Sequence, residues 1–119
     1  MIRDYRDLLI WQGAMKLAKA IYSATATFPV AEMYGLTSQI RRSAISVPSN
    51  IAEGHGRENE GDFRRFLAIA RGSLAELQTQ LILSGDLGFI ENEAVAPLLK
   101  STEELARMIR GMQKSLANK

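Results

Sequence analysis

The stretch Ser38-Gln-Ile-Arg-Arg-Ser-Ala-Ile-Ser-Val-Pro-Ser-Asn-Ile-Ala-Glu-Gly-His-Gly-Arg57 decides the fold of this chain. Its apolar residues recur every three or four positions, which is the spacing of one face of an α-helix. Gly54-His55-Gly56 at its end favours a helix stop. Pro48 lies inside the pattern, where it removes a backbone donor and crowds the carbonyl of Ala44. We therefore expect a long helix with a kink at Pro48.

Three further segments outside this stretch have helical spacing. The first runs from Leu8 to the Phe28-Pro29 step, which ends it because the residue before proline disfavours α geometry. The third starts at Asn59, a favourable N-cap, and breaks at 84–88. The fourth starts near Asn92 and carries apolar residues at heptad spacing from Val95 to Leu116. With no strand pattern, the chain is predicted to be all-α: an antiparallel up-down four-helix bundle, one domain over 1–119, with a proline-kinked second helix.

Composition limits the classes of function. The chain has 119 residues, of which 46% are hydrophobic and 24% charged, and its net charge is +2. It contains no cysteine, which excludes disulfides, thiol nucleophiles and cysteine-based metal sites. No apolar run is long enough to cross a bilayer, and the polar start does not read as a signal peptide. We expect a soluble, cytoplasmic protein with no membrane partner.

A polar stripe follows the predicted second helix, and it can be read in two ways. Its members recur at helical spacing: Arg42, Ser46, Ser49 or Asn50, Glu53 and Arg57. Either they form a solvated face with internal ion pairs, or they form a polar network between helices or between subunits. Pro48 has two readings as well: a tolerated bend around the core, or a kink that shapes an oligomer interface or a ligand groove.

Other residues favour packing roles. Gly72-Ser73 costs helix stability but lets another helix approach closely, so we expect a packing site within or between subunits. Trp11 and Tyr22 are expected to be core or subunit-interface anchors rather than platforms for stacked bases.

Arginines form the strongest candidate binding site. Six of them cluster around the second and third predicted helices: Arg41, Arg42, Arg57, Arg64, Arg65 and Arg71. The guanidinium group donates bidentately to phosphate, although nearby acidic residues can pair with many of these side chains. Arg41, Arg42, Arg64 and Arg65 are the first candidates for nucleic-acid contacts. Arg107, Arg110 and Lys114 are second, and these three also suit the C-terminal dipole of the last helix.

An enzyme is not expected. His55 is the only histidine, so the chain lacks the two Glu-x-x-His motifs of a di-iron bundle. A serine hydrolase would have to use the same residue as its base. No phosphate-cradling glycine motif is present. We predict no catalytic residue, no metal and no cofactor, and we expect His55 to be an exposed residue at a helix end.

Motifs along nearly the whole chain resemble one bacterial family. Leu8 to Gln12 resembles an L-x-x-W-Q opening, and Ser46-Val-Pro-Ser-Asn-Ile-Ala-Glu-Gly54 follows Ser38-Gln-Ile-Arg-Arg42. Phe66-Leu67, Ala70-x-Gly72-Ser73 and Glu76-Leu77 come next in the same order. The ordered set is similar to the four-helix-bundle proteins encoded by intervening sequences of large-subunit ribosomal RNA genes.

The resemblance implies a homopentamer around a central channel. The chain is also similar to the accessory variability protein of diversity-generating retroelements, a basic pentamer associated with reverse transcriptase and nucleic acid. The leading prediction is a non-enzymatic, nucleic-acid-associated oligomer that contacts the phosphates of RNA or an RNA–DNA hybrid. The alternative is a structural or adaptor oligomer that recruits a protein partner, such as a reverse transcriptase, and binds no nucleic acid.

Overall fold

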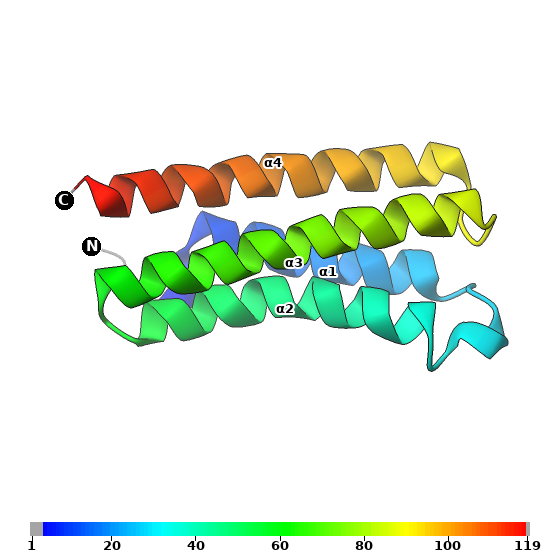
Figure 1. Cartoon of the computed structure of the whole chain (residues 1–119), viewed down its shortest axis with the longest axis horizontal. Helices are drawn as coiled ribbons and strands as arrows, with labels where there is room; N and C mark the ends of the chain where they lie inside the picture. Colours follow the sequence, from blue (N-terminus) through cyan, green and yellow to red (C-terminus); the bar gives the residue numbers. More distant parts are fainter. Residues whose placement is uncertain (1–3, 119) are drawn as a thin grey trace.

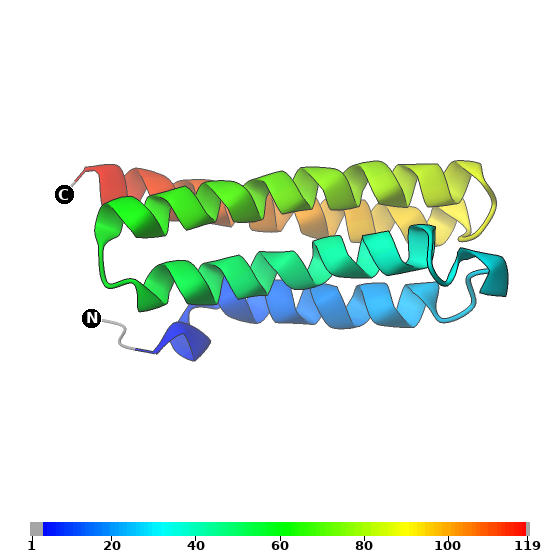
Figure 2. The ribbon, with the colours of Figure 1, turned by 60° about the horizontal axis from the view of Figure 1, so that its bottom comes forward.

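The computed structural model describes residues 4–118 as an elongated bundle of four helices, with extents of 46 × 23 × 20 Å. The helices run alternately up and down and lie side by side (Figures 1 and 2). They are α1 (Leu9–Thr25), α2 (Leu36–Gly56), α3 (Glu60–Asp86) and α4 (Asn92–Ala117), with short 3-10 helices η1 (Tyr5–Asp7) and η2 (Val30–Glu32). Residues 1–3 and 119, which the predicted single domain includes, lie outside the described range. None of the helices within residues 4–118 is long and apolar enough to cross a membrane.

The predicted helices are all present; the first ends earlier than expected, and the second ends at Gly56, within the predicted Gly54-His55-Gly56 stop. The first helix ends at Thr25, earlier than the Phe28-Pro29 step. The Thr25 hydroxyl donates to the carbonyl of Ile21 at 2.8 Å, and the chain then turns as the Phe28 amide donates to the Thr25 carbonyl at 3.1 Å. The second helix continues through Gly54 to Gly56 and contains Pro48, which is buried. The kink at Pro48 stays a prediction.

Asn59 begins α3 as predicted. Its side-chain oxygen accepts the backbone amide of Asp62 at 2.9 Å, which satisfies one of the free donors at the helix start. The residue before it, Glu58, has a φ of 56°, in the left-handed region that favours glycine. The α2–α3 connection is therefore short, capped and strained at one residue.

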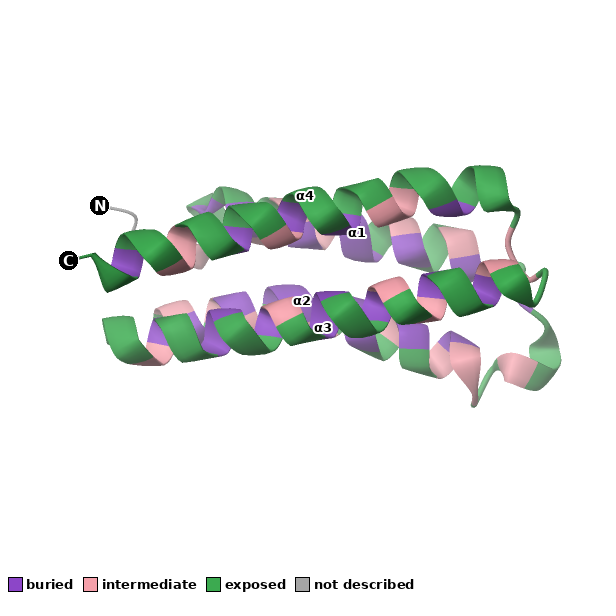
Figure 3. Cartoon of the chain, turned by 45° about the horizontal axis from the view of Figure 1, so that its top comes forward, coloured by how far each residue is buried: buried purple, intermediate pink, exposed green. Residues whose placement is uncertain are grey.

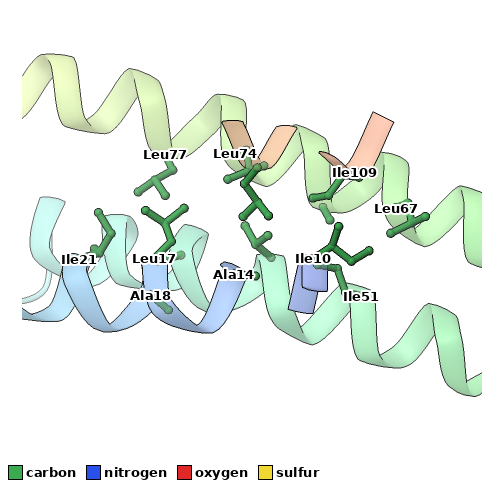
Figure 4. Packing of buried hydrophobic residues seen from close by; sticks show 14 of the residues in the cluster. Ile10, Ala14, Leu17, Ala18, Ile21, Ile51, Leu67, Leu74, Leu77 and Ile109 are labelled. Atoms are coloured by element: carbon green, nitrogen blue, oxygen red, sulfur yellow. The ribbon is translucent and has the colours of Figure 1, made fainter. Parts of the chain in front are cut away.

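The core lies along the bundle axis, where each helix contributes one buried stripe (Figure 3). Figure 4 shows side chains from all four helices meeting there, including Ile21, Ile51, Leu74 and Ile109. Each of these four side chains is at most 1% exposed. Three or four apolar residues per two turns of each helix are enough to enclose this interior.

Helices α2 and α3 pack closely at Gly54, which the sequence analysis treated only as part of a helix stop. A Cβ atom on Gly54 would lie 2.6 Å from the Cβ of Phe66 and 3.2 Å from the ring of Phe63. Real Cβ atoms do not approach other heavy atoms so closely, so only glycine lets α2 and α3 pack together here. Gly54 is a packing residue inside α2, and the helix ends two residues later.

We predict that Gly54→Ala destabilises the protein. Alanine favours a helix by about 1 kcal/mol over glycine, but overpacking the contact with Phe66 costs about 1–3 kcal/mol or more. Gly56→Ala is the matched control, because a Cβ on Gly56 meets nothing within 4 Å. Urea denaturation should show a lower unfolding midpoint for Gly54→Ala and no loss for Gly56→Ala. A Gly54→Ala protein as stable as the wild type would contradict the close-packing interpretation.

We also predict that Glu58→Gly stabilises the chain. A left-handed conformation costs a side-chain-bearing residue about 1–2 kcal/mol, and the entropy that glycine loses on folding offsets part of this. The expected net gain is about 0.5–1 kcal/mol, measured by thermal unfolding. Glu58→Ala removes the same charge but keeps the Cβ atom, so it should give no comparable gain. Equal effects from the two variants would assign the change to charge rather than backbone strain.

Candidate phosphate-binding surface

A row of polar contacts fixes α3 against α4. Gln113 of α4 donates to the backbone carbonyl of Arg64 at 3.2 Å and accepts from the guanidinium of Arg71 at 3.0 Å. Further along, the amide of Gln78 donates to the hydroxyl of Thr102 at 2.9 Å. Both contacts agree with one antiparallel register, in which Gln113 lies between Arg64 and Arg71.

This register gathers cations that lie far apart in the sequence. Arg110 and Lys114 flank Gln113 on α4, and Arg107 lies one turn before Arg110. Arg64 and Arg71 lie on the side of α3 that Gln113 contacts. We call these residues the α3–α4 basic surface: Arg64, Arg71, Arg107, Arg110 and Lys114. Arg71 is half-buried and the other four are exposed.

Acidic residues border the α3–α4 basic surface only at its ends, with Glu60 one turn before Arg64 and Glu103 one turn before Arg107. The α3 segment 63–75 and the α4 segment 105–118 contain no aspartate or glutamate. None of the ion pairs between described residues involves a member of the surface. A cluster of cations without counter-charges produces a positive potential that attracts anions.

The helix dipole explains only part of this arrangement. Arg107, Arg110 and Lys114 lie in the C-terminal half of α4, where cations are favourable. Arg64 lies just after the first turn of α3, at the positive end of that helix, where the dipole gives no reason for a cation. The α3 side of the surface therefore needs another explanation.

Arg65 and Arg57 lie elsewhere, around the ring of Phe66. Their guanidinium carbons are 5.0 Å and 5.1 Å from the ring centroid. Arg65 also pairs with Asp62 at 3.4 Å, and Arg57 pairs with Glu53 at 3.8 Å. These are exposed, local contacts, which contribute little stability. The structure therefore places Arg65 on the α2 side of α3, apart from its sequence neighbour Arg64.

Arg41 is tied to the end of α1. Its Nε donates to the Thr25 hydroxyl at 2.9 Å, and its Nη2 donates to the Tyr22 carbonyl at 3.4 Å. Its guanidinium carbon also lies 4.5 Å from the Tyr22 ring centroid, a cation–π distance. Much of its hydrogen-bonding capacity is therefore used within the chain.

Arg42 is exposed but distant from the α3–α4 basic surface. A hydrogen bond of 2.8 Å between the hydroxyls of Ser46 and Ser73 fixes the register of α2 against α3. In that register about 13 residues of helix separate the levels of Arg42 and Arg64, or about 20 Å along the bundle. The four arginines predicted first for nucleic-acid contacts, Arg41, Arg42, Arg64 and Arg65, therefore do not lie together. Of these, Arg64 lies instead beside the second group of candidates on α4.

The polar stripe of α2 divides into two parts. Asn50 donates to the carbonyl and the hydroxyl of Ser46 at 2.8 and 2.9 Å, and Ser46 bonds Ser73. These three residues form an interhelical network within the chain. Glu53 and Arg57 instead form a pair whose side chains are 54% and 50% exposed, as on a solvated face.

Gly72 does not mediate a contact between helices within the chain. A Cβ atom there would meet nothing within 4 Å, and the residue is exposed. Its neighbour Ser73 is buried and makes the α2–α3 hydrogen bond. The packing role expected for this pair therefore falls on Ser73, while Gly54 is the glycine that lets the two helices meet.

Trp11 lies on the wall of a second feature, which we call the α1–α2 groove. The groove has a volume of about 590 Å³ and is lined by Tyr5, Trp11, Met15, Ala18, Lys19, Tyr22, Ile45, Pro48, Ser49 and Ala52. Trp11 is half-buried against the core and makes an edge-to-face contact of 5.3 Å with Tyr5. Pro48 therefore forms part of a groove wall.

The position of Tyr5 in this wall depends on a small capping motif. The carboxylate of Asp4 accepts the backbone amide of Arg6 at 2.8 Å and pairs with its guanidinium at 2.6 Å. These hydrogen bonds lower the pKa of Asp4 to about 2. The cap of η1 therefore stays ionised at any physiological pH.

His55 is half-buried, rather than exposed as expected. It lies in the last turn of α2, with its ring edge-on to Phe63 at 5.7 Å. No group of three or more His, Cys, Asp and Glu side chains that could hold a metal ion occurs within residues 4–118.

Comparisons with known proteins show the fold by a structural match and the family by a family model. A solved structure from Bacteroides thetaiotaomicron, described as a protein of unknown function from the S23 ribosomal protein family, superposes with a TM-score of 0.79. It is 21% identical, and the match covers 89% of this chain and 99% of the other. No curated protein matches the chain. Neither this structural match nor the family match given next tests the relation to the accessory variability protein of diversity-generating retroelements, which stays a prediction. The family model described as 23S rRNA-intervening sequence protein matches residues 6–111, so the chain belongs to that family.

Proposed function

We propose that this protein is a non-enzymatic, cytoplasmic oligomer that binds RNA or an RNA–DNA hybrid through the α3–α4 basic surface. The observation that carries the proposal is the set of five cations from two helices, none of them in an ion pair with a described residue and with no acidic residue in segments 63–75 and 105–118. Backbone phosphates are the anions that such a surface suits best, because arginine donates to them bidentately.

Recognition on this surface is expected to be independent of sequence. Phe63 and Phe66, the aromatic residues on this part of α3, are buried and offer no platform for stacked bases. Gln113 already has both ends of its side-chain amide in use. The remaining donors are charged groups suited to phosphates, so binding depends on counterion release and weakens as salt rises.

Oligomerisation would strengthen this binding. The family resemblance implies a homopentamer, which would repeat the α3–α4 basic surface five times. One chain carries a net charge of only +2, so a single surface is a weak binding unit. Several linked surfaces on one nucleic acid raise the overall affinity by effective concentration, without any new kind of contact.

We predict that Arg64→Glu/Arg110→Glu weakens nucleic-acid binding. The matched control is Lys16→Glu/Lys100→Glu, which changes the net charge equally at exposed positions outside the surface. Fluorescence anisotropy with labelled RNA duplex and RNA–DNA hybrid at several salt concentrations measures both. The surface variant should bind at least about tenfold more weakly than the control and lose nearly 2 from its log–log salt slope, as for two phosphate contacts. Equal losses in both variants would indicate net charge alone, and no binding by the wild type would remove the proposal.

A separate variant tests whether Arg42 of α2 contacts nucleic acid, as the sequence analysis predicts. Arg42→Glu changes an exposed guanidinium about 20 Å along the bundle from Arg64. If the α3–α4 basic surface is the binding site, this variant should bind RNA as the control does. A loss as large as that of the surface variant would show that nucleic acid also contacts α2.

The α1–α2 groove favours a second function, that of a structural or adaptor oligomer. It exposes an apolar surface that includes Tyr22 and Ile45, which are 42% and 44% exposed. Apolar grooves lined by aromatic residues are typical of protein interfaces. Another subunit of the oligomer, or a partner such as a reverse transcriptase, would be the occupant in this second proposal.

We predict that Trp11→Ala shifts the oligomer toward smaller species. Native mass spectrometry at low salt measures the subunit number and any bound nucleic acid in one experiment. Leu9→Ala is the control, because Leu9 is 70% exposed, lies on the same helix and does not line the groove. Circular dichroism should first show that both variants stay helical. An unchanged subunit number for folded Trp11→Ala would exclude Trp11 as an interface anchor.

A further inference from the structure

A cleft on the outer side of α2 and α3 is lined by polar residues and by Tyr34. Its volume is about 450 Å³, and it lies toward the start of α2, away from the α3–α4 basic surface. Its walls include Arg42, Ser43 and Ser46 from α2, and Ser73, Glu76 and Gln80 from α3. We call it the α2–α3 polar cleft. Its volume falls within the range of pockets that hold small molecules.

The Ser46–Ser73 hydrogen bond fixes how the walls of the cleft face each other. Arg42 lies about one helical turn before Ser46, and Glu76 lies three residues after Ser73. Because the two helices are antiparallel, both residues lie in the same direction from this bond. A guanidinium on one wall therefore faces a carboxylate on the other wall at nearly the same level.

Neither charge has a partner within the described residues. The ion pairs there involve Arg6, Arg57 and Arg65, and no hydrogen bond joins the side chain of Arg42 or Glu76 to another described group. One turn beyond Glu76 on α3, the side-chain oxygen of Gln80 is buried and accepts no hydrogen bond from a described residue. A buried acceptor without a donor is destabilising. A direct Arg42–Glu76 pair would be exposed and weak, and it would leave the Gln80 oxygen without a donor.

We propose that the α2–α3 polar cleft binds a small zwitterion, namely an α-amino acid with a polar, uncharged side chain. Its carboxylate pairs with Arg42 on α2. Its ammonium group donates to the carboxylate of Glu76 on α3, one turn from Gln80. The serine hydroxyls of both walls hydrogen-bond its side chain. A phosphate would be repelled by Glu76, which separates this site from the proposed nucleic-acid surface.

The test uses the full chain labelled with ¹⁵N and titrated with L-glutamine. Amide signals around Arg42, Glu76 and Gln80 should shift and saturate, while those around Gln113 should not move. N-acetyl-L-glutamine lacks the ammonium group and L-glutamine α-amide lacks the carboxylate, so each should bind at least about tenfold more weakly. Absence of saturable shifts with L-glutamine, or equal binding of all three compounds, would overturn the proposal.

Paired variants locate the site. Arg42→Met keeps an unbranched apolar stem and Glu76→Gln keeps the length of the side chain. Both remove the charge, and each should weaken L-glutamine binding at least about tenfold. Lys100→Met and Glu104→Gln make the same changes on exposed positions of α4 and should leave binding unchanged. If all four variants bind L-glutamine like the wild type, the cleft is not its site. Because none of these measurements uses nucleic acid, their result is independent of the function proposed above.

Discussion

The close packing of α2 against α3 at Gly54 is the constraint on which the rest of this structure depends. A side chain as small as alanine would meet Phe66 at 2.6 Å, so the two helices reach their separation only because glycine is there. About two turns further along, that separation allows the two short hydroxyl side chains of Ser46 and Ser73 to bond directly at 2.8 Å. The Gly54–Phe66 contact and the Ser46–Ser73 hydrogen bond together fix the distance between α2 and α3 and their register.

The register of α3 is then passed to α4 by polar side chains that are mostly shielded from water. Thr102 is fully buried, and it both accepts from Gln78 and donates to the carbonyl of Leu99. A shift of one residue would leave such groups unpaired, which is costly in a low-dielectric interior. Apolar contacts are not directional, so they tolerate a shift of one helix along the other better than these hydrogen bonds do. The polar contacts therefore determine which arginines of the two helices become neighbours.

The sequence was enough to predict the helices and the class of fold, because apolar spacing, the Asn59 cap and the helix-ending signals are local properties. It was not enough to predict the sites. Gly54 looked like part of a helix stop, since nothing local shows that Phe66 packs on it. Arg64 and Arg65 looked equivalent as candidate phosphate contacts. Successive residues of an α-helix are rotated by about 100° around its axis, so the two side chains lie on different faces. Which of them meets α4 depends on a register set by residues more than 30 positions away.

Charge distribution, rather than net charge, distinguishes the two polar regions of this bundle. A net charge of only +2 conceals two different regions. In the α3–α4 basic surface five cations form no ion pair with a described residue, and in the α2–α3 polar cleft one guanidinium faces one carboxylate. The first arrangement suits a polyanion, and the second suits a molecule that carries both signs. Arg64 stands at the positive end of α3 against the helix dipole, and Arg42 and Glu76 remain unpaired although they face each other. Neither arrangement is the one that stability alone would favour, so we infer that each reflects a ligand.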